Sequence, residues 1–425
     1  MSRRSPESSP RVLVVGINYP PEHTGIAPYT GAMSRGLARR GIAARVIAAH
    51  PHYPDWKIKP GYGQWSRSEH LDGVAVKRVR HYVPNPPKGA RRLASEVSFG
   101  ARSTVSRWGS PDAIVLVSPA MISSAMAALR AKALHRSAPL IVWVQDLYAR
   151  GMAETGQGGR AAQALGVIEG RLLRSADRVV VIHDRFAEII ARDFGVDRDR
   201  ITVVRNWTHL APFPPIDATS SRERFGWKPD ETVVLHTGNM GVKQGLANVI
   251  DAARVVEHHG DPVRFVLVGD GGERERLQAL ARGVGPLQFI PPLDDADYAA
   301  ALKSADILLV NELAGVAEMA VPSKLTSYFQ AERPVIAATD PTGITASEIR
   351  AADAGIVVPA GDPEALRIAA LDLRANPEQA AAFAANGLHH RQTALDEDAA
   401  VDKFADVLYE VTMIGDRTRS ASTPH

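Results

Sequence analysis

Short apolar runs recur along the whole chain, and almost every run is followed by a loop and then by a helical stretch. The first run is Arg11–Gly16, and the later ones lie at residues 44–49, 113–117, 140–144, 178–182, 201–204, 232–236, 264–269, 287–290, 307–310 and 335–337. Strands that are apolar without interruption are typical of parallel sheets, because helices bury both faces of such a sheet. The alternation therefore predicts an α/β protein with doubly wound parallel sheets.

The pattern stops at a Pro-rich segment, residues 211–215, and starts again at residue 232. A chain of 425 residues, 45% of them hydrophobic, is long enough to bury two cores. We therefore expect two domains between polar tails. Their expected bounds are a disordered tail at 1–10, an N-terminal domain at 11–210, a C-terminal domain at 211–399, a final helix at 400–415 and a second disordered tail at 416–425.

Several classes of protein are excluded or disfavoured by composition and by missing motifs. The chain has no cysteine, which excludes a disulfide framework and a thiolate metal site. The apolar runs are too short to span a bilayer and the first residues lack a signal-peptide core, so we expect a cytoplasmic protein. The first loop does not begin with the G-x-G-x-x-G fingerprint, which disfavours a dinucleotide-dependent oxidoreductase. Residues 294–297, DDAD, are similar to a metal motif, but they precede a helical stretch and are suited to its acidic start, so we expect no metal.

Charge is distributed unevenly along the chain. Residues 1–210 hold 31 Lys and Arg against 16 Asp and Glu, whereas the remainder holds 19 against 31. Residues 51–108 carry 11 basic and 4 acidic residues, interleaved with aromatic residues such as Trp56 and Trp65. This mixture favours contact with an anionic membrane surface and also suits single-stranded nucleic acid. Because no nucleic-acid-binding fold surrounds the segment, we expect a membrane surface and no nucleic acid. An ordinary insertion with solvated charge is the alternative.

The segment 307–337 contains a strand, a small-residue loop with the acid Glu318, and a helix that begins near Pro322. Ser323 is suited to cap this helix, and Lys324 would then occupy its first position. A cation opposes the helix dipole there, so a bound anion would offset the unfavourable energy. Free backbone N–H groups, a positive helix end and an ammonium group together suit a diphosphate. A surface lysine that happens to begin a helix is the alternative.

A glycine-rich loop follows the strand at 232–236 and carries a second basic residue. Gly238 and Gly241 allow the backbone to approach a ligand closely, and Lys243 places charge beside the start of the next helix. One such loop is a weak signal. Its pairing with the helix start at Lys324 strengthens the expectation of a diphosphate site.

Asp146 directly follows the strand at 140–144, within the sequence Gln-Asp-Leu at 145–147. Ligands of α/β sheets gather at the carboxyl ends of the strands, which makes Asp146 a candidate for the cleft. An aspartate that caps a helix or lies in a loop is the alternative.

The strand, the loop with an acid, the Pro-Ser-Lys helix start and the following Arg-Pro-Val-Ile-Ala resemble the donor segment of retaining family 4 glycosyltransferases. The loop at 238–245 and the Gln-Asp-Leu sequence are similar to the exopolysaccharide subgroup that includes colanic-acid-type enzymes. The resemblance covers roughly residues 11–410. It implies the GT-B architecture, in which two Rossmann-like doubly wound domains face each other across a cleft and the final helix crosses back to the first domain. In that architecture, residues 11–210 would form the acceptor- and membrane-facing domain, and residues 211–399 would form the nucleotide-sugar-binding domain.

The resemblance also implies roles for individual residues. Together with the motifs above, it gives a donor-binding set of Gly25, Gly238, Gly241, Gln244, Gly269, Asp270, Ile290, Ser323 and Ser327, and a catalytic set of Glu318, Lys324, Lys243 and Asp146. In most of the family, two glutamates hold the donor sugar and the ribose. Here Ser327 takes the place of the second glutamate, and Met319 takes that of the first, with Glu318 beside it. The anchoring of the ribose is therefore an open question.

The implied activity is a metal-independent, retaining transfer of a sugar from a nucleotide-sugar to a polyprenyl-pyrophosphate-linked saccharide, in exopolysaccharide or other cell-surface polysaccharide synthesis. A UDP-sugar is favoured over a GDP-sugar, and no cofactor is expected beside this substrate. Such an acceptor would place the protein peripherally at the inner face of the plasma membrane. Two alternatives stay open: a non-catalytic nucleotide-sugar-binding partner, and a nucleotide-sugar epimerase of GT-B architecture.

Overall fold

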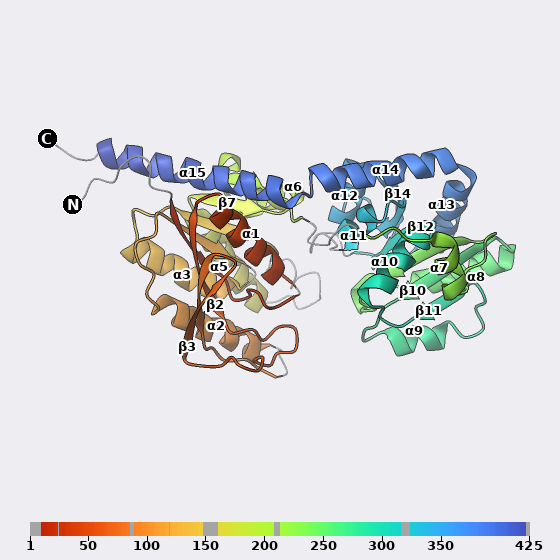
Figure 1. The fold of residues 1–425 in the computed structure, drawn as a ribbon, viewed down its shortest axis with the longest axis horizontal. Helices are drawn as coiled ribbons and strands as arrows, with labels where there is room; N and C mark the ends of the chain where they lie inside the picture. Colours follow the sequence, from red (N-terminus) through yellow and green to blue (C-terminus); the bar gives the residue numbers. More distant parts are fainter. Residues whose placement is uncertain are drawn as a thin grey trace. The chain divides into compact units, whose positions relative to one another are not determined.

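The computed structural model describes residues 10–23, 25–85, 89–118, 120–147, 160–207, 213–315 and 324–421. The chain divides into two compact units, which Figure 1 shows with the chain coloured along its sequence. Unit 1 comprises Met1–Asn206 together with Glu397–His425, and unit 2 comprises Trp207–Asp396. Each unit has a sheet of its own.

Unit 1 contains an eight-stranded sheet with the strand order β3-β4-β2-β1-β5-β6-β7-β8. Every neighbouring pair is parallel except the β3–β4 hairpin at one edge. The strands are β1 (Arg11–Val15), β2 (Ala43–Ala49), β3 (Ser66–Leu71), β4 (Val74–Val79), β5 (Ala113–Val117), β6 (Leu140–Val144), β7 (Arg178–Val181) and β8 (Ile201–Val203). The helices are α1 (Ala27–Arg39), α2 (Ala90–Thr104), α3 (Met121–Leu134), α5 (Arg160–Ser175), α6 (Asp184–Phe194), the short η1 (Arg198–Arg200) and α15 (Glu397–Ala421).

Residues 51–108 form more regular structure than the sequence predicted, because β3, β4 and α2 all lie within them. Arg78 on β4 is fully buried, and its Nε donates to Glu69 Oε1 at 2.7 Å. Trp108 is buried as well, whereas the side chain of Trp65 is 69% exposed. Part of the basic and aromatic content of this segment therefore stabilises the fold of unit 1 and does not face outward.

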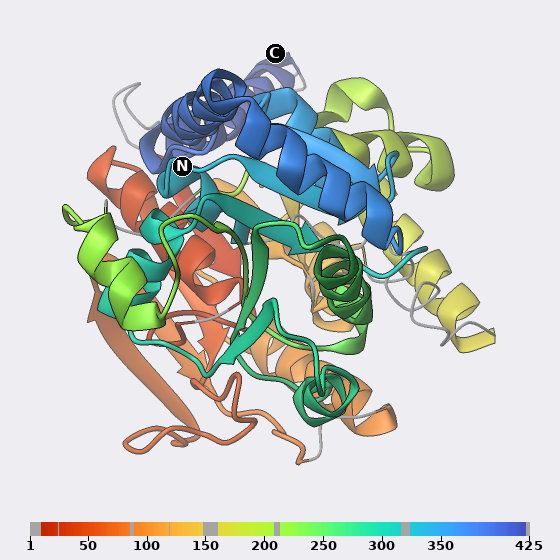
Figure 2. The same ribbon diagram turned by 90° about the vertical axis from the view of Figure 1, so that its right-hand side faces the viewer.

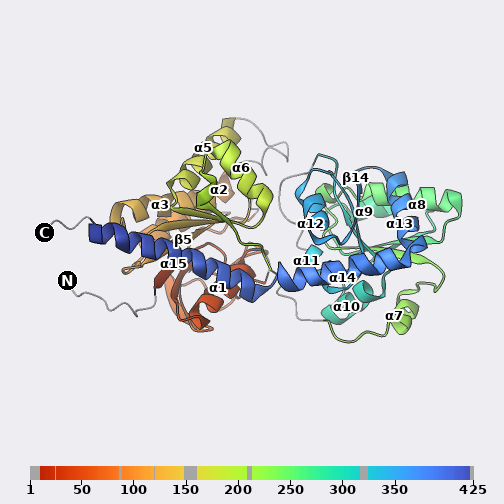
Figure 3. The ribbon, with the colours of Figure 1, turned by 90° about the horizontal axis from the view of Figure 1, so that it is seen from above.

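Helix α15 belongs to unit 1 and packs on α1 (Figure 3). Arg40, next to the last residue of α1, forms ion pairs with Asp398 at 3.1 Å and with Asp402 at 2.5 Å. The ring of Phe404 lies 5.3 Å, between centroids, from the ring of Trp143 on β6. Because exposed ion pairs contribute little, the apolar face of α15 provides most of its attachment. The helix extends to Ala421, beyond the expected end at residue 415, and the outer parts of both expected tails lie outside the described residues.

Unit 2 contains a six-stranded, fully parallel sheet with the order β11-β10-β9-β12-β13-β14. The strands are β9 (Thr232–Thr237), β10 (Val263–Val268), β11 (Leu287–Ile290), β12 (Ile307–Asn311), β13 (Val335–Thr339) and β14 (Gly355–Pro359). The helices are α7 (Ala218–Phe225), the short η2 (Val242–Gln244), α8 (Ala247–His259), α9 (Arg274–Leu280), α10 (Asp295–Ser304), α11 (Lys324–Gln330), α12 (Ile344–Ala352), α13 (Pro363–Ala375) and α14 (Pro377–Thr393).

Side chains of the unit 2 strands alternate between two apolar cores, one on each face of the sheet. On β12, Leu308 and Val310 pack in a core shared with α10, α11 and α12. Ile307 and Leu309 pack in the other core, with α8, α9 and α13. Helices therefore cover both faces of the sheet (Figure 2), which explains why the strands are continuously apolar. The predicted α/β class with doubly wound parallel sheets is confirmed.

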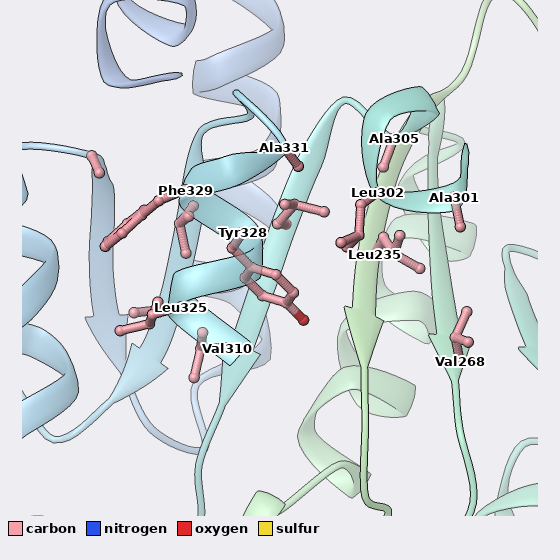
Figure 4. Packing of buried hydrophobic residues seen from close by; sticks show 14 of the residues in the cluster. Leu235, Val268, Ala301, Leu302, Ala305, Val310, Leu325, Tyr328, Phe329 and Ala331 are labelled. Carbon is pink, nitrogen blue, oxygen red and sulfur yellow. The ribbon is translucent and has the colours of Figure 1, made fainter. Parts of the chain in front are cut away.

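Helix α11 contributes Leu325, Tyr328 and Phe329 to the first of these cores, at the helical spacing that the sequence predicted (Figure 4). The hydroxyl of Tyr328 accepts a hydrogen bond from Thr237 N at 2.9 Å and donates to Leu309 O at 3.2 Å. These bonds join α11 to the carboxyl end of β9 at Thr237 and to Leu309 in the middle of β12. They thereby fix the start of α11 beside that edge of the sheet.

The acidic residues before α10 cap that helix. The side chain of Asp294 accepts a hydrogen bond from Asp297 N at 2.9 Å, and Asp297 pairs with Arg224 at 2.7 Å. The interpretation of the DDAD sequence as a helix start is thus confirmed. Among the described residues, no group of three or more His, Asp or Glu side chains is arranged to hold a metal ion. In the same part of the chain, no helix is both long enough and apolar enough to cross a bilayer.

Candidate functional site

The carboxyl end of β9 leads into a glycine-rich loop that lies against the loop after β10. Gly238 has φ +117° and Gly269 has φ +136°, backbone conformations that favour glycine. A Cβ atom on Gly269 would lie 2.0 Å from Gly238 O, so only glycine fits at this contact. The two predicted donor-binding glycines are therefore in direct backbone contact.

The second half of the glycine-rich loop is held by its own side chains and by β12. Gln244 Oε1 accepts a hydrogen bond from Gly241 N at 3.1 Å. Asn311, the last residue of β12, donates from Nδ2 to Gln244 O at 2.7 Å and to Gly245 O at 3.1 Å. Lys243 lies between these fixed points, and its side chain is exposed. The loop is thus rigidly attached to the sheet while its lysine is directed to solvent.

Lys324, the first residue of α11, brings an ammonium group to this loop. Its Nζ lies 3.3 Å from His236 Nε2, and a Cβ atom on Gly238 would lie 3.7 Å from the same Nζ. His236 Nδ1 lies 3.1 Å from Leu309 O, which can only accept, so Nδ1 carries the proton and Nε2 accepts from Lys324. The structure therefore brings together the lysine and the glycine that the sequence pattern paired.

Charge near Lys324 is balanced by a carboxylate that sequence reasoning missed. Glu312 follows β12, where its Oε1 accepts from Thr345 Oγ1 at 2.7 Å and its Oε2 accepts from Thr339 Oγ1. Burial raises the pKa of Glu312, opposed by these two hydrogen bonds and by the charge of Lys324. Burial lowers the pKa of Lys324 to about 8, opposed by Glu312. Burial, and then the charge of Lys324, hold the pKa of His236 well below its ordinary value, so His236 is neutral.

Three further predicted residues lie near this cluster in less direct roles. Ser327 is buried on α11, next to Tyr328. Asp270 is exposed, and its Oδ1 accepts from Gly271 N at 2.8 Å. The carbonyl oxygen of Ile290 already accepts a hydrogen bond from Gly269 N at 3.1 Å, so it contributes to the backbone hydrogen bonding at the edge of the sheet. Glu318 and Ser323 lie outside the described residues.

Gly25 and Asp146 lie in the other unit, where both line one pocket of about 190 Å³. We call it the unit 1 pocket; Asn18, Tyr53, Trp56 and Glu96 also line it. The predicted site residues are thus divided between two places, a cationic cluster in unit 2 and a pocket in unit 1.

His236 and Glu312 were missed because the sequence gives little reason to choose them. His236 is the one strongly polar residue in the strand at 232–236, and a single histidine in a strand is usually structural. Glu312 directly follows an apolar strand, the same signal that pointed to Asp146. If the residues that follow every strand of the sheet had been considered as candidates, Glu312 would have been among them.

Comparison with known proteins agrees with this geometry. Residues 24–207 match the family model described as a glycosyl transferase 4-like domain, and residues 217–390 match the model of glycosyl transferases group 1. The chain is 34% identical over 332 residues to a putative colanic acid biosynthesis glycosyl transferase, WcaI, of Escherichia coli strain K12. That match covers 75% of this chain and 80% of the relative. The chain belongs to glycosyltransferase family 4.

Solved structures show that this glycosyltransferase has the GT-B fold. Sucrose-phosphate synthase from Thermosynechococcus elongatus superimposes with a TM-score of 0.68 at 17% identity, covering 95% of this chain and 100% of that one. Anabaena HepE in complex with UDP-glucose superimposes with a TM-score of 0.65 at 15% identity, covering 94% and 100%. The predicted GT-B class, with two Rossmann-like units, is confirmed by these neighbours.

Proposed function

We propose that this glycosyltransferase moves a sugar from a UDP-sugar to a lipid-linked saccharide, with retention of the anomeric configuration and without a metal ion. The observation that carries the proposal is the cluster of Lys324, His236 and Gly238 at the carboxyl edge of the unit 2 sheet. The UDP-glucose complex of Anabaena HepE, which has the same fold, supports a uridine nucleotide as the donor.

The chemistry needs negative charge to be stabilised on a leaving diphosphate. The bond from the sugar C1 to the diphosphate oxygen breaks, and a bond from C1 to the acceptor hydroxyl oxygen forms on the same face of the sugar. The proton of that hydroxyl leaves with the released UDP. In this proposal Lys324 and the exposed Lys243 supply positive charge, and the N–H groups of the loop after β9 supply hydrogen bonds. Because Lys324 is held next to the glycine-rich loop by His236, its part of this stabilisation is prepared before the substrate arrives.

His236 and Glu312 keep Lys324 in place in this proposal. Neutral His236 accepts a hydrogen bond from the ammonium group without competing for a phosphate, since it has no second proton to donate there. Glu312 is fixed by Thr339 and Thr345 and favours the charged form of the lysine. Together they hold a charged lysine at a site where burial alone would favour its neutral form.

We predict that UDP binding weakens as the pH rises through the pKa of Lys324. Burial sets that pKa at about 8, and only the charged ammonium attracts the diphosphate. The affinity should be nearly constant below that pH and should fall by up to about tenfold per pH unit above it. Calorimetric titration of UDP between neutral pH and pH values just above the pKa of Lys324 measures this change.

The matched control for the pH titration is Lys324→Met, which keeps the apolar stem of the side chain. This variant should bind UDP weakly at every pH and should lose the dependence. A pH dependence that persists unchanged in Lys324→Met would assign the titration to another group and would count against the proposed site.

A lipid-linked acceptor is supported by the similarity to the putative colanic acid biosynthesis glycosyl transferase and by the charge of residues 51–108. Arg80 and Arg91 are exposed in this segment, as is Trp65. Basic residues and an exposed indole suit an anionic membrane surface. We therefore propose a peripheral position at the inner face of the plasma membrane.

We predict that the protein co-sediments with vesicles in proportion to their anionic lipid, and that salt weakens this binding. Each basic residue near such a surface contributes about 1 kcal/mol, screened by salt. The double variant Arg80→Gln, Arg91→Gln should bind less, whereas Arg282→Gln, an exposed arginine of unit 2, should bind normally. Equal sedimentation with neutral and anionic vesicles would contradict the membrane proposal.

A further inference from the structure

The short turn that carries Lys243 is held by hydrogen bonds from the carboxyl end of β12. Asn311, only 1% exposed, donates from Nδ2 to Gln244 O at 2.7 Å and to Gly245 O at 3.1 Å. Leu313 N donates to Lys243 O at 2.8 Å. Three successive carbonyl groups of the turn are therefore bound by one strand end.

The turn also packs directly on the backbone of this strand end. Gly245 has φ +55°, a left-handed conformation that favours glycine. A Cβ atom on Gly245 would lie 2.9 Å from Leu313 Cα and 3.0 Å from Leu313 N. Because backbone meets backbone here, no flexible side chain could move aside. The position of the turn therefore follows the strand end and its anchor, Asn311.

Asn311 is itself fixed by a second buried asparagine. Asn248, in the first turn of α8, donates from Nδ2 to Asn311 Oδ1 at 2.9 Å. This bond leaves Nδ2 of Asn311 facing the carbonyl groups of the turn, which can only accept. Because the amide is buried, a substitution that removes Nδ2 would leave Gln244 O without the donor that the structure gives it.

The same strand end also reaches the second cation of the cluster. Successive side chains of a strand point to opposite faces of the sheet. Asn311 points to the side of α8, whereas Glu312 points to the side of α12, where it accepts from Thr345 Oγ1 at 2.7 Å. Glu312 also favours the charged form of Lys324. Two neighbouring residues thus connect to the Lys243 turn and to Lys324, one on each face of the sheet.

We propose that Asn311 is a positioning residue for the donor: its amide, oriented by Asn248, fixes the Lys243 turn so that Lys243 and Lys324 bind one diphosphate together. This inference rests on the proposed transfer from a UDP-sugar and goes beyond it by assigning a role to the two asparagines. The side chain of Lys243 is exposed and has a flexible stem, so its ammonium group stays near the diphosphate only when the turn is fixed. Asn311 acts through Lys243 and does not contact the diphosphate.

The experiment is a double-mutant cycle in UDP affinity, measured by ligand-observed NMR on the full-length protein at a pH where Lys324 is charged. Lys243→Met should weaken UDP binding about 10- to 100-fold, and Asn311→Leu should weaken it at least about fivefold. In the Lys243→Met background, Asn311→Leu should weaken binding by less than about twofold, because the lysine through which it acts is absent. A substitution with a merely structural effect would weaken binding by the same factor in both backgrounds.

Uridine and a second variant separate positioning from folding. Uridine lacks the diphosphate, so folded Asn311→Leu should bind it as the unchanged protein does. Asn248→Ala keeps Asn311 and removes the bond to its Oδ1, so it should weaken UDP binding by a smaller factor and only while Lys243 is present. The cycle of Asn248→Ala with Lys243→Met carries the same test where Asn311→Leu fails to fold.

The matched control is Asn376→Leu, since Asn376 also donates from Nδ2 to a backbone carbonyl, Asp372 O, at 3.0 Å. Asn376 directly follows α13, whose last turn reaches the first residue of β9, because Arg374 Nη1 donates to Thr232 Oγ1 at 2.8 Å. That contact lies at the amino end of β9, whereas the Lys243 turn follows its carboxyl end. Asn376→Leu should therefore bind UDP normally.

Three outcomes would overturn the inference while the unchanged protein binds UDP. They are normal UDP binding by Lys243→Met, an equal factor for Asn311→Leu in both backgrounds, and an equal loss of UDP and uridine in folded Asn311→Leu. None of the three touches the role of Lys324, which the pH titration and Lys324→Met test separately. Absent UDP binding by the unchanged protein would instead sink the proposed function, and this inference with it.

Discussion

Replacing Lys324 with methionine is expected to slow sugar transfer by about two to three orders of magnitude. The ammonium Nζ lies 3.3 Å from His236 Nε2 and next to Gly238, where the leaving diphosphate is proposed to develop charge. Methionine keeps the apolar stem and removes the charge, so the melting temperature should hardly change. Release of nucleoside diphosphate at saturating donor measures the loss.

The control for this variant is a lysine of the same unit with a different environment. Lys303 pairs with Glu332 at 2.5 Å, and Lys303→Met should transfer sugar at the normal rate. A folded Lys324→Met protein with near-normal transfer would remove Lys324 from the site.

Gly269→Ala is expected to destabilise unit 2 by about 3–5 kcal/mol, the sum of backbone strain and overpacking. The new Cβ atom would lie 2.0 Å from Gly238 O, in a conformation with φ +136°. Relief requires the loops after β9 and β10 to separate, which would also displace the glycine-rich loop from Lys324. Urea unfolding measures the stability, and UDP titration measures the effect on the site.

Gly272→Ala is the matched control for this substitution. Gly272 lies in the same turn, but a Cβ atom there would meet no atom within 4 Å. Its stability and UDP affinity should stay close to those of the unchanged protein. Equal unfolding midpoints for Gly269→Ala and Gly272→Ala would show that the two loops do not depend on their close contact.

The parallel strands were predictable because burial on both faces of a sheet requires an uninterrupted run of apolar residues in each strand. Leu308 and Leu309 of β12 face opposite cores, so no polar residue interrupts the strand. The edge hairpin β3–β4 was missed because the side chains of β3 alternate between half-buried and exposed and include Glu69 and His70. A charged edge strand of this kind has the composition of a loop.

The residues of the candidate cluster in unit 2 could be picked out from the sequence where a residue type has few structural uses. Gly238 was a candidate because glycine in a loop allows the backbone to approach a ligand closely. Lys324 was a candidate because a cation at a helix start opposes the helix dipole unless an anion binds there. His236 and Glu312 could not be identified as partners of Lys324, since their roles depend on distances between β9, β12 and α11 that only the fold supplies. Arg78 shows the reverse case, a basic residue assigned to a surface that the fold buries.

The serine at position 327 leaves two other activities to be separated from transfer. A family glutamate at this place would bond the ribose, and Ser327 is shorter, uncharged and buried. A protein that only binds nucleotide-sugar, or one that isomerises it, would use the same diphosphate cluster. Both differ from a transferase in the fate of the sugar.

Mass spectrometry of the products therefore tests the proposed transfer most directly. The protein is incubated with a panel of UDP- and GDP-sugars, with and without a polyprenyl-pyrophosphate-linked saccharide. We predict that a UDP-sugar is consumed only when the acceptor is present, and that the acceptor gains the mass of one sugar residue. Donor that binds but stays intact with every acceptor, or donor that is isomerised without any acceptor, would contradict the account.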